Sequence, residues 1–499
     1  MPAKTLIVIG AGLAGLAAGV HAQRNGYQTQ IFEHGSQPGG VAVGWRRGEY
    51  FIDGGIHFLM GHRPGQPVHS IYEEVGTAGP EMCVDMDDYG LFVDERSGRQ
   101  LAVTADLDRL LADWRSLSPE DAPVMAELIH VARQLAGSDA LNLGMGDPPE
   151  LAGRFAGLGL LWQMRSVLRY FAGPTAQTMG ERGRAIRDPW LRQVYENLFF
   201  PQAPVWFVAM VLALLSSRAM GLLKGGSTSF VRPIERCFRD LGGEVAYNAT
   251  VEKILAEDGR AVGVRLYDGR EHRAGAVISA ADGHSTLFEM LGEPYVDAAL
   301  RERFEKWALI PPMVMLSFGV DREFAGEPHI HAYFLDRPFA VGPREVGALL
   351  LRTFNYSPVF APRGKTVVQA TFDSDWDYWC ELRRDQLAYE AEKRRVAGEV
   401  LEQLERHYPG LTGQVEVTDV ATPCTTWRYT RNYRGAYEGW LPTPKQLMTA
   451  LPRTLKGLDR FVMAGQWIMP GGGVPTCIAS GRDAVRILCA KDGVAFRPR

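Results

Sequence analysis

The chain opens with a short apolar run, an alanine-rich stretch and a second strand-like run. Leu6 to Ile9 is wholly apolar, and such a run before a glycine turn predicts a buried β-strand. The stretch that follows predicts a helix ending at Gly26, and residues 28–32 predict a second strand. This order of strand, helix and strand is typical of an α/β fold with a parallel sheet.

Strand-like runs return in the middle of the chain, after a helical pattern that extends from about residue 105 to 222. Pro311 and Pro312 interrupt the pattern once more. Residues 50–57 predict a short strand that enters another glycine turn. Further strands are predicted at 244–247, 250–257, 261–266, 276–279, 313–320, 329–334, 348–354, 366–372 and 460–464, with a charged helix at 385–406. A glycine loop at 465–476 and a closing helix complete the chain.

This order predicts a discontinuous architecture. A Rossmann-type nucleotide-binding domain is expected from three parts, residues 1–95, 225–300 and 456–499. Two insertions are expected to form a mixed α+β substrate domain: a helical or lid part at 96–224, and an antiparallel sheet with helices at 301–455. A chain of 499 residues is long enough for these domains.

Composition excludes several classes of function. The net charge of −4 gives no electrostatic reason to expect a nucleic-acid partner. The six cysteines form no CxxC pair, which indicates a reducing compartment rather than zinc or disulfides. The first predicted strand leaves no room for a signal peptide, and the longest apolar run, 205–215, is shorter than the roughly 20 residues of a membrane span. A cytoplasmic protein, with peripheral membrane contact as an alternative, is expected.

The glycines after the first strand predict a dinucleotide site. Gly10 is expected to make the tight turn, Gly12 to let the backbone approach a pyrophosphate, and Gly15 to let the helix pack on the strand. The helix N-terminus supplies free N–H groups for the phosphates. Glu33, at the tip of the second strand, can accept hydrogen bonds from a ribose.

The segment from Ala464 to Arg482 carries the second signal. Its three consecutive glycines, followed by a helix, allow the backbone to lie flat against a planar ring. The helix dipole would then stabilise negative charge on that ring, as on a reduced flavin. The alternative is an ordinary loop and helix start.

Together these motifs resemble the FAD-dependent phytoene desaturases and carotenoid isomerases. The resemblance is carried by the N-terminal glycines, Glu33, Gly39-Gly40, the turn Asp53-Gly-Gly-Ile-His57, Val251, residues 276–282 and the PGGGVP loop at 470–475. The Gly54-to-His57 turn is also similar to the retinol saturase branch. The architecture implied is that of the flavin amine oxidase superfamily, and it covers most of the chain.

The resemblance implies FAD and a set of residues that hold it. The pyrophosphate would lie at the first glycines, the adenosine ribose at Glu33, the adenine at the Val251 backbone, and the ribitol and flavin ring at 465–474. Gln466 stands where the group usually has an acidic residue, and it can still donate and accept hydrogen bonds. The predicted cofactor-binding residues are Gly10, Gly12, Leu13, Ala14, Gly15, Glu33, His34, Gly39, Gly40, Gly54, Gly55, Ile56, His57, Val251, Ala281, Gly465, Gln466, Gly472, Gly473 and Val474.

His57 is the candidate catalytic residue. It follows two glycines on a turn expected to approach the flavin, where it could bond to the ring or act as an acid or base. The alternative is that it anchors the turn. His329 and His331 lie two apart on a predicted strand, but no further ligands have matching spacing, so no metal site is expected.

Three segments are candidates for contact with an apolar substrate or a membrane. Residues 427–440 are aromatic and basic, and are expected either to pack on the core or to line the site with flat surfaces suited to a polyene. Residues 203–215 are expected to line a substrate tunnel or the core. Residues 154–171 have a basic face, typical of a surface helix or of one lying in a membrane interface.

Three functions remain open at this point. The first is an FAD-dependent oxidoreductase or isomerase (desaturase, saturase or isomerase type) acting on carbon–carbon bonds of a long apolar isoprenoid, carotenoid-like or retinoid-like. The second is a flavin amine oxidase, and the third a non-catalytic prenyl-lipid-binding protein of the same fold. No second GxGxxG motif follows a strand, so the electron acceptor would be oxygen, a quinone or another carrier.

Overall fold

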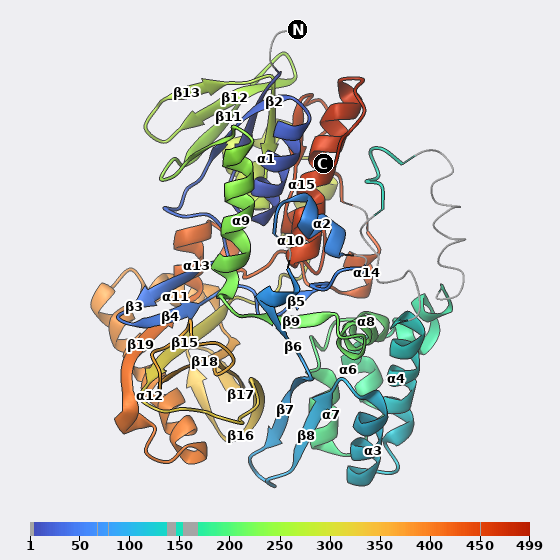
Figure 1. Cartoon of the computed structure of the whole chain (residues 1–499), viewed down its shortest axis with the longest axis vertical. Helices are drawn as coiled ribbons and strands as arrows, with labels where there is room; N and C mark the ends of the chain where they lie inside the picture. Colours follow the sequence, from blue (N-terminus) through green and yellow to red (C-terminus); the bar gives the residue numbers. More distant parts are fainter. Residues whose placement is uncertain (1–3, 67, 78, 137–145, 153–167, 450) are drawn as a thin grey trace.

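The computed structural model describes residues 4–66, 68–77, 79–136, 146–152, 168–449 and 451–499. The molecule has an upper half that contains both termini and a lower half made of a large sheet beside a group of helices (Figure 1). The helix expected at 154–171 falls almost entirely outside the described residues. None of the helices in the described ranges is long and apolar enough to cross a membrane.

A five-stranded parallel sheet forms the centre of the upper half. Its order is β10-β2-β1-β14-β20. The wholly apolar run after Thr5 becomes the central strand because it is covered on both faces. The strands are β1 (Lys4–Ile9), β2 (Tyr27–Phe32), β10 (Glu244–Ala246), β14 (Ala276–Ser279) and β20 (Phe461–Met463). Three distant parts of the chain thus share one sheet, and the α/β prediction is confirmed.

Helices and a small sheet cover this parallel sheet. Helix α1 (Leu13–Arg24) packs between α9 (Gly226–Asp240) and α15 (Val474–Lys491). On the other side an antiparallel sheet of β11 (Val251–Glu257), β12 (Arg260–Leu266) and β13 (Glu271–Arg273) packs against β14. Helix α10 (Ala298–Lys306) follows, after a π-helical turn at Ser285–Met290. The first and last helices of the chain therefore lie side by side.

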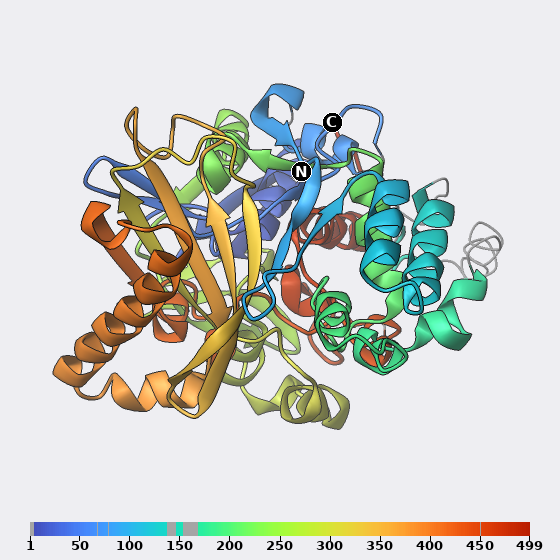
Figure 2. The same cartoon turned by 90° about the horizontal axis from the view of Figure 1, so that it is seen from below.

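A seven-stranded sheet forms one side of the lower half, in the order β19-β15-β18-β17-β16-β7-β8. Its strands are β7 (Asp88–Asp94), β8 (Gln100–Thr104), β15 (Met313–Val320), β16 (Ile330–Val341), β17 (Arg344–Thr353), β18 (Thr366–Asp373) and β19 (Val415–Ala421). Helices α11 (Trp376–Leu382) and α12 (Gln386–His407) lie on the outer side of this sheet, away from the helical part (Figure 2).

The sequence pattern does not predict β7 and β8. They join the sheet through a parallel pairing of β7 with β16, in which Leu91 lies opposite His331. They also pair with each other across residue 95, where the first nucleotide-binding part was expected to end. The five-part division of the chain stays a prediction.

The helical part lies beside this sheet. It contains α3 (Leu107–Leu117), α4 (Ala122–Ala136), α6 (Met179–Gly183), α7 (Pro189–Glu196) and α8 (Val205–Ser216). Helix α8 is buried over most of its surface, and it packs on α4. It is therefore a core helix, which agrees with one of the two alternatives for this apolar run.

Short elements connect the halves. The hairpin of β3 (Gly44–Arg47) and β4 (Tyr50–Asp53) leads into the glycine turn, and β5 (Leu59–Met60), β9 (Met220–Leu223) and β6 (Cys83–Asp85) form a small sheet. Helices α2 (His69–Glu74), α13 (Pro423–Thr430) and α14 (Pro444–Leu447) complete the described helices. The strand predicted to enter the glycine turn is confirmed.

Candidate functional site

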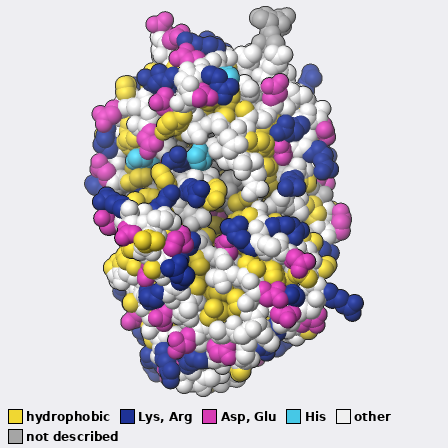
Figure 3. Space-filling view, turned by 90° about the vertical axis from the view of Figure 1, so that its left-hand side faces the viewer, with side chains coloured by type: hydrophobic (Ala, Val, Ile, Leu, Met, Phe, Trp, Pro, Cys, Tyr) yellow, Lys and Arg dark blue, Asp and Glu magenta, His cyan; other side chains and the backbone are white. Residues whose placement is uncertain are grey.

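A pocket opens at the carboxyl ends of β1, β2 and β14, the edge at which parallel α/β sheets bind nucleotides. The face between the two halves is hollowed there, with hydrophobic and basic side chains around the hollow (Figure 3). We call this the cofactor pocket. The predicted residues that line it are Gly10, Gly12, Leu13, Ala14, Glu33, His34, Gly39, Gly40, Val251, Ala281, Gly465 and Gln466. Of the aromatic and basic segment, residues 429–432 line it as well.

Of the glycines at positions 10, 12 and 15, only Gly12 has open space beside it for a bound ligand. Gly10 has a φ of +93°, which favours glycine, and its N–H donates to the Phe32 carbonyl at 2.8 Å. A Cβ on Gly15 would lie 1.9 Å from the Gly10 carbonyl oxygen, so this glycine is needed for packing. A Cβ on Gly12 would meet only the Gly39 oxygen, at 4.0 Å. Gly12 thus presents open space at the start of α1, which fits a pyrophosphate.

Glu33 is buried at the tip of β2 with both carboxylate oxygens engaged. They accept the N–H groups of Ala11 and Gly35, each at 2.6 Å. Burial raises the pKa of Glu33, and these two hydrogen bonds oppose that rise. His34 next to it contacts the Thr250 hydroxyl at 2.7 Å and the Arg428 carbonyl at 2.9 Å. These contacts connect the segment after β2 to the residue before β11 and to α13.

The C-terminal loop has the backbone geometry that its glycines predict. Gly471, Gly472 and Gly473 have φ values of +85°, +51° and +94°. A side chain is disfavoured at all three positions, so the backbone before α15 is bare. At the start of the loop, the N–H of Gly465 donates to the Ser480 hydroxyl of α15 at 2.8 Å. Gly472, Gly473 and Val474 do not line the cofactor pocket itself.

The glycine turn after β4 lies outside the cofactor pocket, together with Gly15. Gly54, Gly55, Ile56 and His57 form this turn, which is held from two sides. The hydroxyl of Tyr437 donates to the Gly54 carbonyl at 3.0 Å and also to that of Gly55. On the other side, the N–H of Ile56 donates to the Ser227 hydroxyl at 2.6 Å.

His57 is neutral in this environment. Burial, followed by the charge of Arg352, lowers its pKa to about 3. Its ring lies 5.6 Å from the ring of Tyr437, and its Nε2 has no hydrogen-bond partner. The imidazole can therefore bond to a ligand but carries no proton to give from a cationic form at neutral pH.

The comparisons with known proteins agree with this geometry. The model of the family "Flavin containing amine oxidoreductase" matches residues 13–489. The chain belongs to this family. Its cofactor is FAD, as the resemblance implies.

Curated relatives of this flavin-containing oxidoreductase include enzymes named for carotenoids. The chloroplastic prolycopene isomerase of Arabidopsis thaliana is 25% identical over 500 residues, which cover 97% of this chain and 81% of the relative. A lycopene-forming phytoene desaturase of Pseudescherichia vulneris is 24% identical over 523 residues, covering 97% and 99%. The structure of cyclohexylamine oxidase from Brevibacterium oxydans superposes with a TM-score of 0.61 at 14% identity, covering 99% of this chain and 100% of that one. The last comparison confirms the amine-oxidase-like fold.

Near the C-terminal loop of the flavoprotein, Phe207 belongs to a set of partly accessible apolar side chains. These pack on the core of the helical part but keep some exposed surface. Phe207 of α8 approaches within 3.6 Å of the position of a Cβ on Gly471. Burial raises the pKa values of Tyr89 and Tyr356. The set comprises Phe58, Met60, Tyr89, Phe207, Met210, Ala332, Leu350 and Tyr356, and we call it the apolar lining.

Two charged residues near the flavoprotein's glycine segments were missed at the level of sequence. Arg352 of β17 is only 4% exposed and donates to the Gln369 side chain at 3.1 Å. Glu438 follows Tyr437 and lies against Gly472. The one available signal was the apolar or aromatic residue directly before each, Leu351 and Tyr437, which favours burial of the charge.

Proposed function

We propose that this protein acts on carbon–carbon bonds of a long apolar isoprenoid, carotenoid-like or retinoid-like. The apolar lining carries the proposal. Its members come from the helical part, the segment after the glycine turn and the large sheet, and Phe207 lies beside the bare backbone of the C-terminal loop. Flat aromatic surfaces suit a conjugated chain, and the names of the curated relatives point to the same substrate class.

The two glycine segments would hold the two ends of FAD. Gly10, Gly12 and the start of α1 would bind the pyrophosphate, and Glu33 the adenosine ribose. Residues 465–474 would lie along the ribitol and the ring, and the glycine turn with His57 would face that ring. When bound, the flavin supplies hydride exchange with a substrate carbon. The protein's part is to exclude water and to hold the polyene in one register against the ring.

Co-expression with carotenoid precursors tests this function. Lipids extracted from the cells are compared by mass spectrometry, with and without oxygen, between wild type and a Gly12→Ala variant. The proposal is supported if a polyene gains or loses two hydrogens, or changes its double-bond geometry, in cells with the wild type but not in cells with the variant. Amine-dependent release of peroxide, with no change in any polyene, would instead make the protein an amine oxidase.

A second outcome would point to a lipid carrier. If the purified protein lacks the absorbance near 450 nm (roughly the band of oxidised flavin) and carries an unchanged isoprenoid, the non-catalytic alternative holds. We further propose peripheral contact with membranes, because a substrate of this class dissolves in lipid. Flotation with anionic vesicles checks that contact.

A further inference from the structure

Glu438 lies where the two glycine segments of the flavin site meet. Its Oε2 is 2.9 Å from the place that a Cβ on Gly472 would occupy, so the carboxyl lies directly on the C-terminal loop. Its neighbour Tyr437 is bound to the carbonyls of Gly54 and Gly55 on the opposite segment. The backbone of this short segment therefore fixes the carboxyl between the loop and the turn.

The carboxyl of Glu438 has no polar partner among the described residues. None of their hydrogen bonds reaches it, and no lysine, arginine or histidine nitrogen in the described ranges lies within 4.0 Å of it. The buried acids nearby are different. Glu33 accepts two backbone N–H groups, and the two oxygens of Asp282 accept those of Ser285 and Tyr433, each at 2.8 Å. Those acids stabilise loops, whereas Glu438 stabilises none by such a bond.

The surroundings of Glu438 keep it poised between its two protonation states. Burial raises its pKa to about 7. Two titratable groups interact electrostatically with Glu438: Tyr437 on its own segment and Cys477 of α15. Burial raises the pKa of both groups, and that of the Cys477 thiol reaches about 12. His57, across the ring of Tyr437, is neutral. Glu438 is only partly buried, so its side chain keeps some accessible surface.

We propose that Glu438 is the catalytic residue that exchanges a proton with the substrate beside the flavin. The proposal rests on the proposed function. Formation of a C=C bond from two neighbouring C–H groups would release a proton to the Glu438 carboxylate and a hydride, for which bound oxidised flavin would be the acceptor. The electron pair of the C–H bond that loses the proton becomes the π bond. In the saturating direction the same carboxylic acid returns the proton.

The variant Glu438→Gln tests this role because it keeps the size of the side chain and removes its titration. With the polyene that the wild type converts, we expect a loss of about 100-fold or more in rate, with unchanged FAD content. As pH increases through about 7, the wild-type rate should rise for C=C formation and fall for saturation. The rate of the variant should not change with pH in this range. Glu196→Gln is the matched control, since Glu196 also packs against a glycine (Gly183) and burial also raises its pKa. It should keep its rate within twofold.

A measurement without substrate separates this proposal from the proposed function. We expect the flavin absorbance of the wild-type holoenzyme to shift with a midpoint near pH 7, the control to keep the shift, and Glu438→Gln to lose it. A shift that persists in Glu438→Gln, its absence from the wild type, or a variant rate within threefold of wild type would each overturn the role of Glu438. Failure of the wild type to convert any polyene, with the titration as expected, overturns only the substrate class.

Discussion

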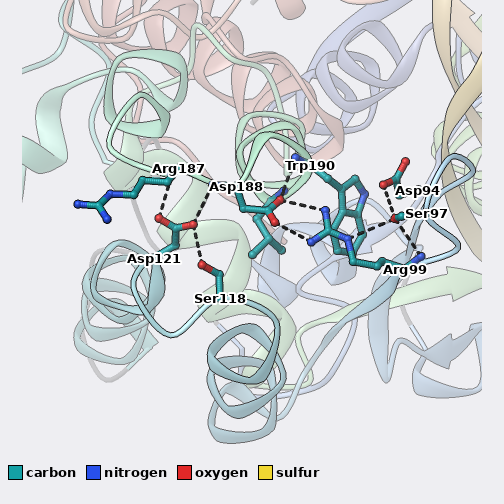
Figure 4. Close-up of polar contacts among 9 residues, drawn as sticks. Asp94, Ser97, Arg99, Ser118, Asp121, Arg187, Asp188 and Trp190 are labelled. Atoms are coloured by element: carbon teal, nitrogen blue, oxygen red, sulfur yellow. Dashed lines mark hydrogen bonds and ion pairs between the residues drawn. The ribbon is translucent and has the colours of Figure 1, made fainter.

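Arg99 donates from both of its terminal nitrogens to the carboxylate of Asp188, at 2.6 and 3.1 Å, and its guanidinium lies 4.7 Å from the centre of the Trp190 ring (Figure 4). The pair connects the loop between β7 and β8 to the start of α7, whose first N–H groups Asp188 also caps. Burial alone would raise the pKa of Asp188, but Arg99 and the capped N–H groups outweigh it and lower the pKa. This contact fixes the edge of the large sheet to the helical part.

Two replacements of Asp188 should distinguish the contribution of its ion pair to the unfolding free energy from the contribution of its helix cap. Asparagine is also a good N-cap, so Asp188→Asn removes mainly the charge and should cost about 1–3 kcal/mol of unfolding free energy. Asp188→Ala should cost roughly 1 kcal/mol more. Urea unfolding at pH 7 measures both. The exposed pair of Glu120 with Arg187 is the control, and Glu120→Gln should cost less than about 0.5 kcal/mol. Equal losses in all three variants would contradict the role of the pair.

Replacement by alanine should have different effects at two glycines of the same motif, with loss of FAD binding at Gly12 and loss of stability at Gly15. Gly12 has a φ of −71°, which alanine adopts freely, so Gly12→Ala should leave the unfolding free energy within about 1 kcal/mol while FAD binding falls. Gly15→Ala places a methyl group against a carbonyl oxygen and should cost about 3 kcal/mol or more. Thermal unfolding of the apoprotein and flavin absorbance per mole of protein distinguish the two. A Gly12→Ala protein with full FAD content would show that the ligand does not approach there.

Acid should weaken the contact between the two ends of the chain. Burial opposes ionisation of Asp492, but its bonds to Tyr27, Arg460 and Lys4 outweigh this and lower its pKa to about 2. A depressed pKa in the folded state gives stability that is present above the unfolded pKa and is lost as pH falls toward 2. Asp492→Asn should therefore lower the unfolding free energy by roughly 2 kcal/mol at pH 7. Urea unfolding from pH 7 to 2 should show this difference begin to shrink below pH of about 4 and disappear near pH 2, and a constant difference would contradict the assignment.

The imidazole of His57 should remain neutral over the whole physiological range. With ¹⁵N-labelled histidine, the resonances that vanish in His57→Gln identify this ring. We expect its ¹⁵N chemical shifts to stay constant from pH 8 to about 4, because the pKa of the ring is about 3 and the ring becomes protonated only near that pH. A transition between pH 5 and 7 would show that the ring is charged and restore it as an acid candidate.

The sequence predicted those parts of the fold whose conformation depends on their own residues and immediate neighbours. The run that becomes β1, the glycines after it and the loop before α15 carry their conformations in their own residues. The strand β7 could not be predicted in this way, because its mixed sequence is stabilised by pairing with β16, about 240 residues away. The same holds for Glu438. Nothing next to it in sequence indicates that its carboxyl meets Gly472, since that contact exists only once the two segments come together.

The parallel sheet of the upper half also constrains how the protein is made. One of its two edge strands, β20, is formed by residues 461–463, and Gly465 and Gln466 of the cofactor pocket follow directly. A nascent chain that still lacks these residues leaves the edge of β14 unpaired and has no closed site for FAD. The cofactor can therefore be retained only after residues 461–466 have left the ribosome, and fragments ending before residue 460 should be colourless and prone to aggregate.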